Sequence, residues 1–400
     1  MDKLHLGVLY GSRSCEHEVS IISALQLINA VDRSKYDVTP IYITQQGEWY
    51  VGDRLTDMKL YTDFDPYKAG LKRVSLDLTA GSGALIHYEQ GKGLLRGIRE
   101  EVVTRIDCFI PVFHGLHGED GSIQGLLELA NIPYTSPGIA GSAIGMDKIL
   151  MKHFFRGMGF PVLKGVDCLR RRWHADADAM IAEIEDALPY PVFVKPACLG
   201  SSIGVSRADD RDALKNALEL AFSYDRRVLV EQGLDKPVEI NCSVLGYDGE
   251  TETSVLEMPL TDSGTLGFEE KYLRGSSSAK GMASMGRVLE PDIGEELSSQ
   301  IRSLATSIFN ALDCKGVVRI DFMIDRGSGE IYITEINTIP GSLAYYLWTK
   351  KSVTYAALID RMVDCAMQAQ REKDENQYAF RSNILNNVKL GGKTPKGGKL

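Results

Sequence analysis

Hydrophobic and polar residues alternate along the first third of the chain in a way that predicts strands connected by helices. Short apolar runs with the length of buried strands occur at 4–10, 38–43, 106–115 and 132–136. Apolar residues at helical spacing follow the first and third runs. Strands that alternate with helices favour a parallel sheet, so we expect an open, parallel, Rossmann-like α/β domain over 1–136. No G-x-G-x-x-G follows the first strand, so dinucleotide binding is not indicated.

From about residue 137 the pattern changes to longer elements. A helix is predicted at 146–159, a strand ending at Lys195 precedes a Gly/Ser loop, and RDALKNALELAFSY (211–224) is an amphipathic helix. Two strands, a long helix and the hairpin VVRIDFMIDRGSGEIYITEIN follow. We therefore expect a central unit over 137–231 and a C-terminal unit over 232–372.

Two polar stretches lack an apolar period. Residues 261–287 are rich in Gly and Ser, which predicts a mobile loop. Residues 373–400 end in a Lys- and Gly-rich segment, which predicts a disordered tail.

Composition narrows the class of protein. The chain has 400 residues, 44% of them hydrophobic and 25% charged, which is typical of a globular protein with two or three domains. A net charge of −9 argues against nucleic acid or an anionic membrane as the main partner. No apolar run approaches the ~20 residues that span a bilayer, and the seven scattered cysteines show no zinc spacing. We expect a cytoplasmic protein with buried thiols.

The hairpin carries the strongest chemical signal. Side chains two apart on a strand share a face, so Arg319 lies with Asp321, and Glu335 lies with Asn337. If residues 327–329 form a three-residue loop, Asp321 lies opposite Glu335 and Arg319 opposite Asn337. Such clustered carboxylate and amide oxygens suit Mg²⁺. The alternative is a solvated strand face, but the flanking residues are apolar, which favours a site.

A phosphate-binding loop is the second candidate feature. Lys195 ends an apolar strand just before GSSIG (200–204), whose backbone N–H groups can hold phosphate oxygens, and Lys148 starts a nearby helix. Alone, GSSIG is more typical of a hairpin turn. Glu231, at the end of VLVE, can accept hydrogen bonds from adenine or ribose, or can be an ordinary strand-end acid.

Two acidic loops in the first domain begin predicted helices, where α/β sheets bind ligands. They contain Glu16 with Glu18, and Glu119 with Asp120. Glu16 could hold an amine cation, whereas simple helix capping is the alternative for all four acids. His114 and His117 lack a third ligand at a fixed spacing, so a metal is not expected there.

These motifs in this order resemble the D-alanine–D-alanine ligases of the ATP-grasp superfamily. The resemblance covers residues 11–341 and rests on SCEHEVSIISA, HGLHGEDGSIQGLLELANIPYTSPG, SAIGMDK, VFVKPACLGSSIGVS, VEQGLDKPVEI, FEEKYL, RIDFMID and EINTIPG. It implies an ATP-grasp fold after the N-terminal domain, with ATP between the second and third units. It also implies that ATP phosphorylates the first D-alanine and that the amine of a second attacks the acylphosphate, in peptidoglycan precursor synthesis.

The resemblance implies a role for particular residues. ATP would be bound by Lys148, Lys195, Glu231, Glu239 and Lys271. Two Mg²⁺ or Mn²⁺ ions would be held by Asp321, Glu335 and Asn337. The catalytic positions would be Glu16, Ser201, Tyr272, Arg319 and Gly341, the last through its N–H. Substrates would contact Glu16, His114, Tyr346 and Leu347.

One position departs from the family pattern. Tyr346 stands where family members have a Ser that helps bind the carboxylate of the second substrate, so a ligase with a different second substrate is an open alternative. Tyr346 can also be a packing residue. A non-catalytic nucleotide-binding regulator is the alternative from another class. The family implies small D-amino acids as partners, and a homodimer.

Overall fold

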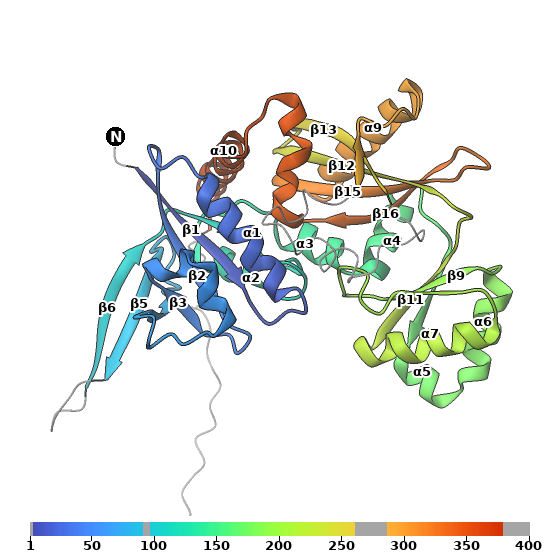
Figure 1. Cartoon of the computed structure of the whole chain (residues 1–400), viewed down its shortest axis with the longest axis horizontal. Helices are drawn as coiled ribbons and strands as arrows, with labels where there is room; N and C mark the ends of the chain where they lie inside the picture. The colour runs from blue at the N-terminus through green and yellow to red at the C-terminus, as the bar shows by residue number, and fades with distance from the viewer. Residues whose placement is uncertain (1–2, 91–96, 261–285, 379–400) are drawn as a thin grey trace, which may run out of the picture.

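The computed structural model describes residues 3–90, 97–260 and 286–378, whose strands form three sheets (Figure 1). In the first sheet β1 (Leu4–Gly11) pairs in parallel with β2 (Tyr36–Ile43) and β7 (Cys108–Pro111). Helices follow two of these strands, α1 (His17–Ala30) and α2 (Ser122–Ala130). β1 is buried along most of its length, as expected for a central parallel strand. The predicted parallel α/β arrangement is confirmed for these strands.

The rest of this sheet is antiparallel, which the sequence did not reveal. It contains β3 (Trp49–Val51), β4 (Lys72–Leu76), β5 (Ala84–Gln90) and β6 (Ile98–Arg105). Between β3 and β4 lie the short 3-10 helices η1 (Asp53–Thr56) and η2 (Met58–Thr62). β6 is exposed along most of its length, so it lacks the buried, alternating face that would predict a strand.

The predicted strand at 132–136 is wrong. This segment makes a single parallel bridge, between Tyr134 and Phe109. Pro133 has no N–H to donate and Pro137 follows closely, so a longer ladder is not available.

The second sheet has the order β10-β9-β11-β8. Its strands are β8 (Gly165–Leu169), β9 (Val192–Pro196), β10 (Ser206–Ala208) and β11 (Arg227–Gln232). The short α5 (Arg170–Ala175) follows β8, and α6 (Ala177–Ala187) and α7 (Arg211–Tyr224) pack against one face of the sheet (Figure 1). Two further helices, α3 (Ile139–Met146) and α4 (Lys148–Gly157), precede this sheet in the chain.

The third sheet has the order β14-β13-β12-β15-β16. Its strands are β12 (Val238–Tyr247), β13 (Glu250–Pro259), β14 (Arg287–Leu289), β15 (Gly316–Ile324) and β16 (Ile331–Asn337). One face packs against α9 (Glu295–Ala311) and α4. Two 3-10 helices, η4 (Gly341–Leu347) and η5 (Thr349–Lys351), follow β16 and lead to α10 (Tyr355–Asp374). Both η4 and α10 share a hydrophobic core with α1 and β1, which joins the third sheet to the first.

Parts of the predicted loop and tail lie outside the described residues. Of the predicted loop 261–287, residues 261–285 are not described, and Arg287 begins β14. The predicted tail begins slightly too early, because α10 continues to Asp374. Residues 379–400 are not described.

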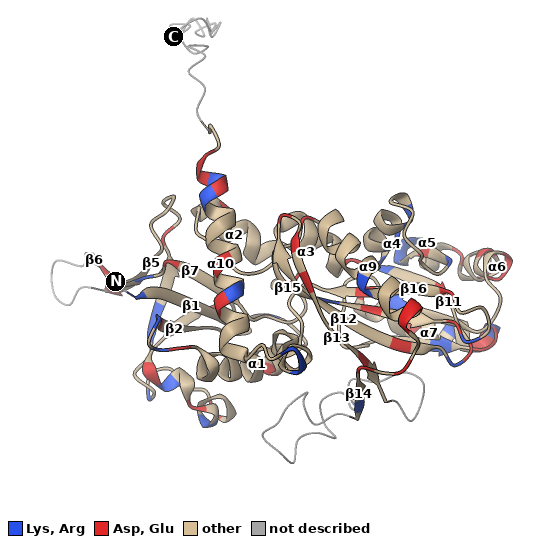
Figure 2. Ribbon diagram, turned by 90° about the horizontal axis from the view of Figure 1, so that it is seen from above, with Lys and Arg blue, Asp and Glu red and all other residues tan. Residues whose placement is uncertain are grey.

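The surface of the described residues carries mixed charge. Basic and acidic residues are interspersed along α7 and α10, whereas the charged residues of α6 are all acidic (Figure 2). No helix in the described ranges is long and apolar enough to cross a bilayer.

Candidate active site

The β15–β16 hairpin brings the predicted metal-binding residues together. Arg319 pairs with Asn337, and Asp321 pairs with Glu335, as the sequence predicted. The route to this register differs from the prediction. The loop has four residues rather than three, because Asp325 and Glu330 close the hairpin, and a bulge at Thr334 then restores the expected pairing. The longer loop shifts the register by one residue, and the bulge shifts it back by one, so the predicted pairs at the site are correct.

Asp321 is at the centre of this face. Its two oxygens accept hydrogen bonds of 2.7 Å each from Nε and Nη2 of Arg319, and Nδ2 of Asn337 donates to Oδ2 at 3.0 Å. Although burial opposes the charge on Arg319, the paired Asp321 carboxylate keeps the pKa of the guanidinium well above its usual value. The arrangement orders an arginine beside clustered oxygen ligands.

The donor set fits a hard divalent cation. Asp321 and Glu335 supply two carboxylates and Asn337 an amide oxygen, and Mg²⁺ in nucleotide sites takes its remaining ligands from water and phosphate. Within residues 3–90, 97–260 and 286–378, no group of three or more His, Cys, Asp and Glu side chains forms a complete metal site by itself. The three oxygen donors of the hairpin leave coordination positions that water and phosphate can fill.

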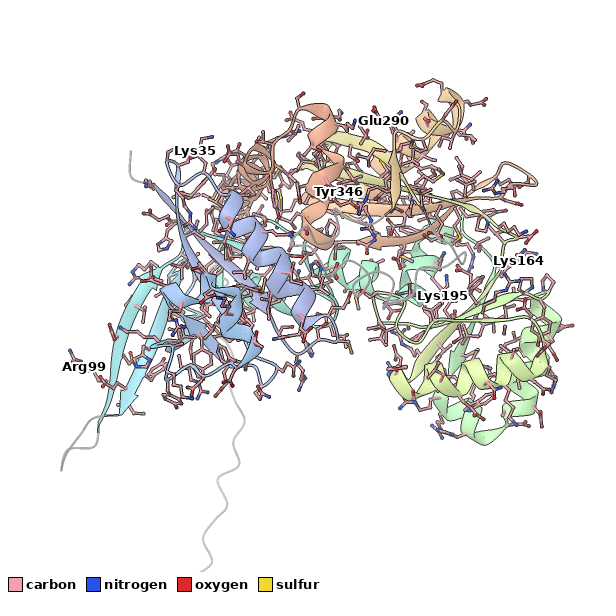
Figure 3. All side chains as sticks on the ribbon, in the orientation of Figure 1. Lys35, Arg99, Lys164, Lys195, Glu290 and Tyr346 are labelled. Carbon is pink, nitrogen blue, oxygen red and sulfur yellow. The ribbon has the colours of Figure 1, made fainter. Side chains whose placement is uncertain are left out.

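A buried lysine, Lys152, and a half-buried one, Lys195, lie close to the hairpin. Nζ of Lys195, on β9, lies 2.6 Å from Oε2 of Glu231, and Nζ of Lys152, on α4, lies 2.6 Å from Oε1 of the same carboxylate. Lys152 also donates to the carbonyl of Ile333 on β16 at 2.7 Å, so it joins the hairpin to the second sheet. Figure 3 shows Lys195 on the side of the second sheet that faces the third sheet.

These charges act on one another and on the hairpin. Burial raises the pKa of Glu231, but the two lysines outweigh it and lower that pKa to about 2. For Lys195, burial is outweighed by Glu231, Glu335 and Glu239, so its pKa is raised. For Lys152, burial outweighs the attraction of Glu231, and its pKa is lowered. The carboxylate of Glu335 acts on both lysines, so the predicted phosphate and metal groups face the same space.

Glu231 does not lie in the open, where its carboxylate could accept hydrogen bonds from adenine. Its side chain is 1% exposed and each of its oxygens has a lysine partner. In this arrangement Glu231 holds Lys195 in position. Glu239 lies on β12 opposite Met323 of β15, on the same face as Asp321.

The GSSIG loop has the backbone of an anion-binding turn. Ser201, Ser202 and Gly204 have φ values of 50°, 58° and 72°, and left-handed turns of this kind direct successive N–H groups to one side. Lys148 joins this loop, because its Nζ donates to the carbonyl of Leu199 at 2.6 Å. The structure therefore places Lys148 beside the start of the loop, as predicted.

Glu16 connects the first domain to this loop. It precedes α1 without capping it, and its carboxylate accepts a hydrogen bond from Oγ of Ser201. A Cβ at Gly115 or Gly200 would lie 2.7 Å or 2.5 Å from Oε2 of Glu16, so the lack of a side chain at both positions leaves room for the carboxylate. The capping alternative for Glu16 is wrong, and the carboxylate is held instead between two loops of different sheets.

Glu119 was read from the sequence as one of four helix-start acids. Its Oε2 accepts from the N–H of Gly115 at 2.9 Å, and its Oε1 accepts from the N–H of Ile339 at 2.9 Å. Burial, followed by the nearby charge of Glu16, raises its pKa to about 8. Glu119 therefore ties the first-domain loop to the turn after β16. Asp120 keeps a local role, since it accepts from the N–H groups of His117 and Ser122.

The turn after β16 has unusual backbone geometry. Ser342, Leu343 and Ala344 have φ values of 48°, 53° and 50°, and all three are buried. Left-handed backbone costs about 1–2 kcal/mol for each residue with a side chain. Only surrounding contacts can hold three such residues in a row, and these contacts lie next to Gly341, the predicted donor to the reacting carbonyl.

Tyr346 contacts the ion pair formed by Arg287 and Glu257. Its hydroxyl donates to Oε2 of Glu257 at 3.0 Å, and the guanidinium of Arg287 lies 4.2 Å from the centre of its ring. Arg287 and Asn241 also bond to Glu257, at 2.8 Å and 3.1 Å. Glu257 pairs with Asn241, and Asn241 with Asp321, so this cluster continues the face of the predicted metal residues across β12. Figure 3 labels Tyr346 on the helical segment that lies beside the third sheet.

Comparisons with known proteins identify this arrangement. Residues 5–137 match the sequence pattern described as D-ala D-ala ligase N-terminus, and residues 154–364 match the one described as D-ala D-ala ligase C-terminus. The chain belongs to the D-alanine–D-alanine ligase family. The predicted family and enzyme class are confirmed, and the ATP-grasp fold with an N-terminal α/β domain is the fold of this family.

The relatives cover almost the whole chain. The D-alanine–D-alanine ligase of Thermosipho africanus is 36% identical over 96% of this chain and 98% of its own length, and that of Acetivibrio thermocellus is 37% identical over 92% and 96%. Among solved structures, the ligase from Coxiella burnetii has a TM-score of 0.75 at 27% identity, covering 94% of this chain and 97% of its own. The VanG D-Ala:D-Ser ligase from Enterococcus faecalis has a TM-score of 0.74 at 29% identity, covering 91% and 100%.

Four described residues of this ligase site were missed or misread in the sequence. Lys152 is four residues after Lys148 on one helix, a spacing that could have suggested a second inward lysine. Glu119 was read only as a capping residue. Glu257 and Ser23 carry no local signal, because their partners are 89 and 319 residues away. Lys271 and Tyr272, which the resemblance places in the site, lie outside the described residues.

Proposed function

We propose that this chain joins D-alanine to a second D-amino acid, with conversion of ATP to ADP and phosphate. One observation carries the proposal. The Arg319–Asp321–Glu335–Asn337 face lies within electrostatic reach of Lys152 and Lys195, so cations and oxygen ligands surround one space that suits a nucleoside triphosphate.

The residues divide into a nucleotide side and an amino-acid side. Lys148, Lys195 and the loop at 200–204 contact phosphate oxygens, and Glu231 fixes Lys195. Glu16 receives the ammonium group of the first amino acid, held for this by Ser201 and by the two glycine loops. When bound, Mg²⁺ held by Asp321, Glu335 and Asn337 neutralises phosphate charge.

The reaction has two steps. In the first, a carboxylate oxygen of the first amino acid attacks the γ-phosphorus, and the bond to ADP breaks. In the second, the amine nitrogen of the second amino acid attacks the acylphosphate carbonyl, and phosphate and a proton leave as the peptide bond forms. Arg319 and the N–H of Gly341 stabilise the negative charge that develops on the carbonyl oxygen.

The identity of the second amino acid depends on Tyr346. In the family a small hydroxyl at this position binds the carboxylate of the second substrate, whereas the phenol of Tyr346 is already bonded to Glu257. This observation supports a second candidate function, ligation of D-alanine to an acceptor other than D-alanine. The VanG structure is named for the acceptor D-Ser, so acceptor choice differs among structural neighbours of this chain.

The test is product analysis. The purified enzyme is incubated with ATP, Mg²⁺ and D-alanine, alone or with a panel of small D-amino acids, and ADP release and dipeptides are measured. D-alanyl-D-alanine as the main product supports the leading proposal, and a mixed dipeptide as the main product supports the second. ADP release that no D-amino acid stimulates would refute both.

Compartment and assembly complete the proposal. All seven cysteines are free thiols, which agrees with a reducing compartment such as the cytoplasm, where ATP is also available. A homodimer follows from the resemblance, and light scattering of the purified chain tests it.

A further inference from the structure

A network of hydrogen bonds connects α1 to the strained turn after β16. Oγ of Ser23 accepts from the N–H of Ser342 at 3.2 Å and lies 2.9 Å from Nε2 of His114. Nδ1 of His114 lies 3.1 Å from the carbonyl oxygen of Ile339. Oγ of Ser342 donates to Oε1 of Gln26 at 2.7 Å. The turn is thus held on both sides of Gly341.

We propose that Ser23, Gln26 and His114 are positioning residues that hold the turn at 339–344 so that the N–H of Gly341 points at the reacting carbonyl. The inference rests on the proposed function, since it assigns these residues to its second step. His114 then acts through the backbone and not through a substrate, because both of its ring nitrogens have partners within the protein.

The direction of each hydrogen bond follows from the chemistry of the groups. The carbonyl of Ile339 can only accept, so Nδ1 of His114 carries the ring proton. Nε2 of the neutral ring then accepts from the hydroxyl of Ser23, whose lone pair is left for the N–H of Ser342. Burial lowers the pKa of His114 to about 4, which keeps the ring neutral and this direction unchanged near neutral pH.

The turn needs this support. Three consecutive residues with side chains have left-handed backbone, and their own side chains do not favour that conformation. Without the bonds from α1, the turn can relax to right-handed or extended backbone, which would move the neighbouring N–H of Gly341. Displacement of a reacting group by about 1 Å costs on the order of 100-fold in rate.

Helix α1 also connects the residues proposed to contact the two ends of the first substrate, its ammonium group and its carbonyl. Glu16 immediately precedes the helix, and Ser23 and Gln26 lie two to three turns further along it. The same rigid element therefore sets the site of the first ammonium group and the backbone that faces the carbonyl carbon of that substrate.

The test compares Ser23→Ala with a matched control on the same helix. Ser20 is also buried, and its hydroxyl bonds to Gly11 and Val112, away from the turn. Ser20→Ala therefore removes a similar number of buried hydrogen bonds from α1 but leaves the network to Ser342 intact. Melting temperatures of both variants measure the structural cost of each change.

The kinetic readout separates the two steps. Acylphosphate formation is followed with ¹⁸O-labelled ATP and D-alanine, as positional exchange of the label, and ligation is followed as dipeptide release. We expect Ser23→Ala to lower kcat for ligation about 10- to 100-fold, while the exchange rate and the KM for ATP stay within about twofold of wild type. Ser20→Ala should leave all three near the wild-type values.

Two results would overturn the inference. One is a loss of ligation in Ser23→Ala no larger than in Ser20→Ala, and the other is an equal loss in exchange and ligation. If Ser23→Ala does not fold, Gln26→Leu and Ser342→Ala replace it. These two changes remove the same hydrogen bond, between Ser342 and Gln26, from its two ends. Each should therefore lower the ligation rate equally, and the double variant should lose no more than either alone. Additive losses, or no loss, would overturn the inference. Wild-type product formation, measured alongside, tests the proposed function separately.

Discussion

The β15–β16 hairpin and the turn that follows it are adjacent in the chain, yet different kinds of information determine them. In the hairpin, polar and apolar residues alternate, so the pattern alone places Arg319 and Asp321 on one face. In the turn, Ser342, Leu343 and Ala344 adopt a backbone that their side chains disfavour, and partners from α1 more than 300 residues away hold it. Local pattern therefore supplies the charged groups of the site, and tertiary contacts supply its backbone geometry.

The largest effect is expected at Lys152, which anchors the hairpin to the second sheet. Lys152→Met removes one partner of an ion pair whose side chains are 4% and 1% exposed. Removal of one partner of a buried pair costs about 3–5 kcal/mol, and we expect the lower end because Lys195 still pairs with Glu231. Chemical denaturation measures the change. In the double variant Lys152→Met/Lys195→Met the loss should be larger, because both cationic partners of Glu231 are removed, and an equal or smaller loss would contradict the assignment.

The same pair predicts an acid dependence. Glu231 has a pKa of about 2 in the folded chain, below its ordinary value of 4.5, so its contribution is fully present above pH 4.5. The contribution is lost as the pH falls from 4.5 towards 2, and wild-type stability should fall with it. Lys152→Met should show a flatter loss over this range, because less stabilisation of the carboxylate remains. Melting curves between pH 2 and 6 test this, and parallel curves for both proteins would count against it.

The next effect concerns the chemistry of the hairpin. Glu335→Gln removes one charge from the predicted metal ligands without changing the size of the side chain, so kcat should fall at least ~100-fold with the fold intact. The control is Glu330→Gln, an exposed position just before β16 whose carboxylate accepts a hydrogen bond from the hydroxyl of Tyr332. Its activity should stay near wild type. Normal turnover of Glu335→Gln at saturating Mg²⁺ would exclude Glu335 as a ligand.

The features that could be predicted from the sequence are those that depend on local pattern and not on tertiary contacts. The pattern predicted the parallel core, the helix at 211–224, a helix over 293–312 that the structure places at 295–311, and the pairing of Arg319 with Asn337. The phosphate and metal ligands that we propose stand out in the sequence as charged residues inside apolar runs. The antiparallel strands between 49 and 105 were missed, because β6 is too exposed to show an alternating apolar face.

Contacts between distant segments were out of reach. Glu119 reads as a helix-start acid until the structure places Ile339 beside it, 220 residues away. The partners of Glu231 are Lys152 and Lys195, and no spacing in the sequence distinguishes that pair from an adenine contact. Such residues become recognisable only when the fold brings their partners within hydrogen-bond distance.

The smallest effect, and the one that most sharpens the comparison, concerns Tyr346 at the end of the turn. The residue is buried, as packing requires, but its phenol reaches a polar face through Glu257, which packing alone does not require.

Tyr346→Ser should restore a small hydroxyl and enlarge the acceptor pocket. One gained or lost polar contact to a substrate is worth about 1–3 kcal/mol, or roughly 5- to 150-fold in specificity. We expect this change in kcat/KM for D-alanine relative to larger acceptors, with little change in the KM for ATP. Tyr345→Phe is the control, since Tyr345 stacks on Tyr355 with a ring separation of 4.4 Å. If wild type and Tyr346→Ser rank an acceptor panel identically, Tyr346 only packs, and the turn contributes its backbone alone to the choice of substrate.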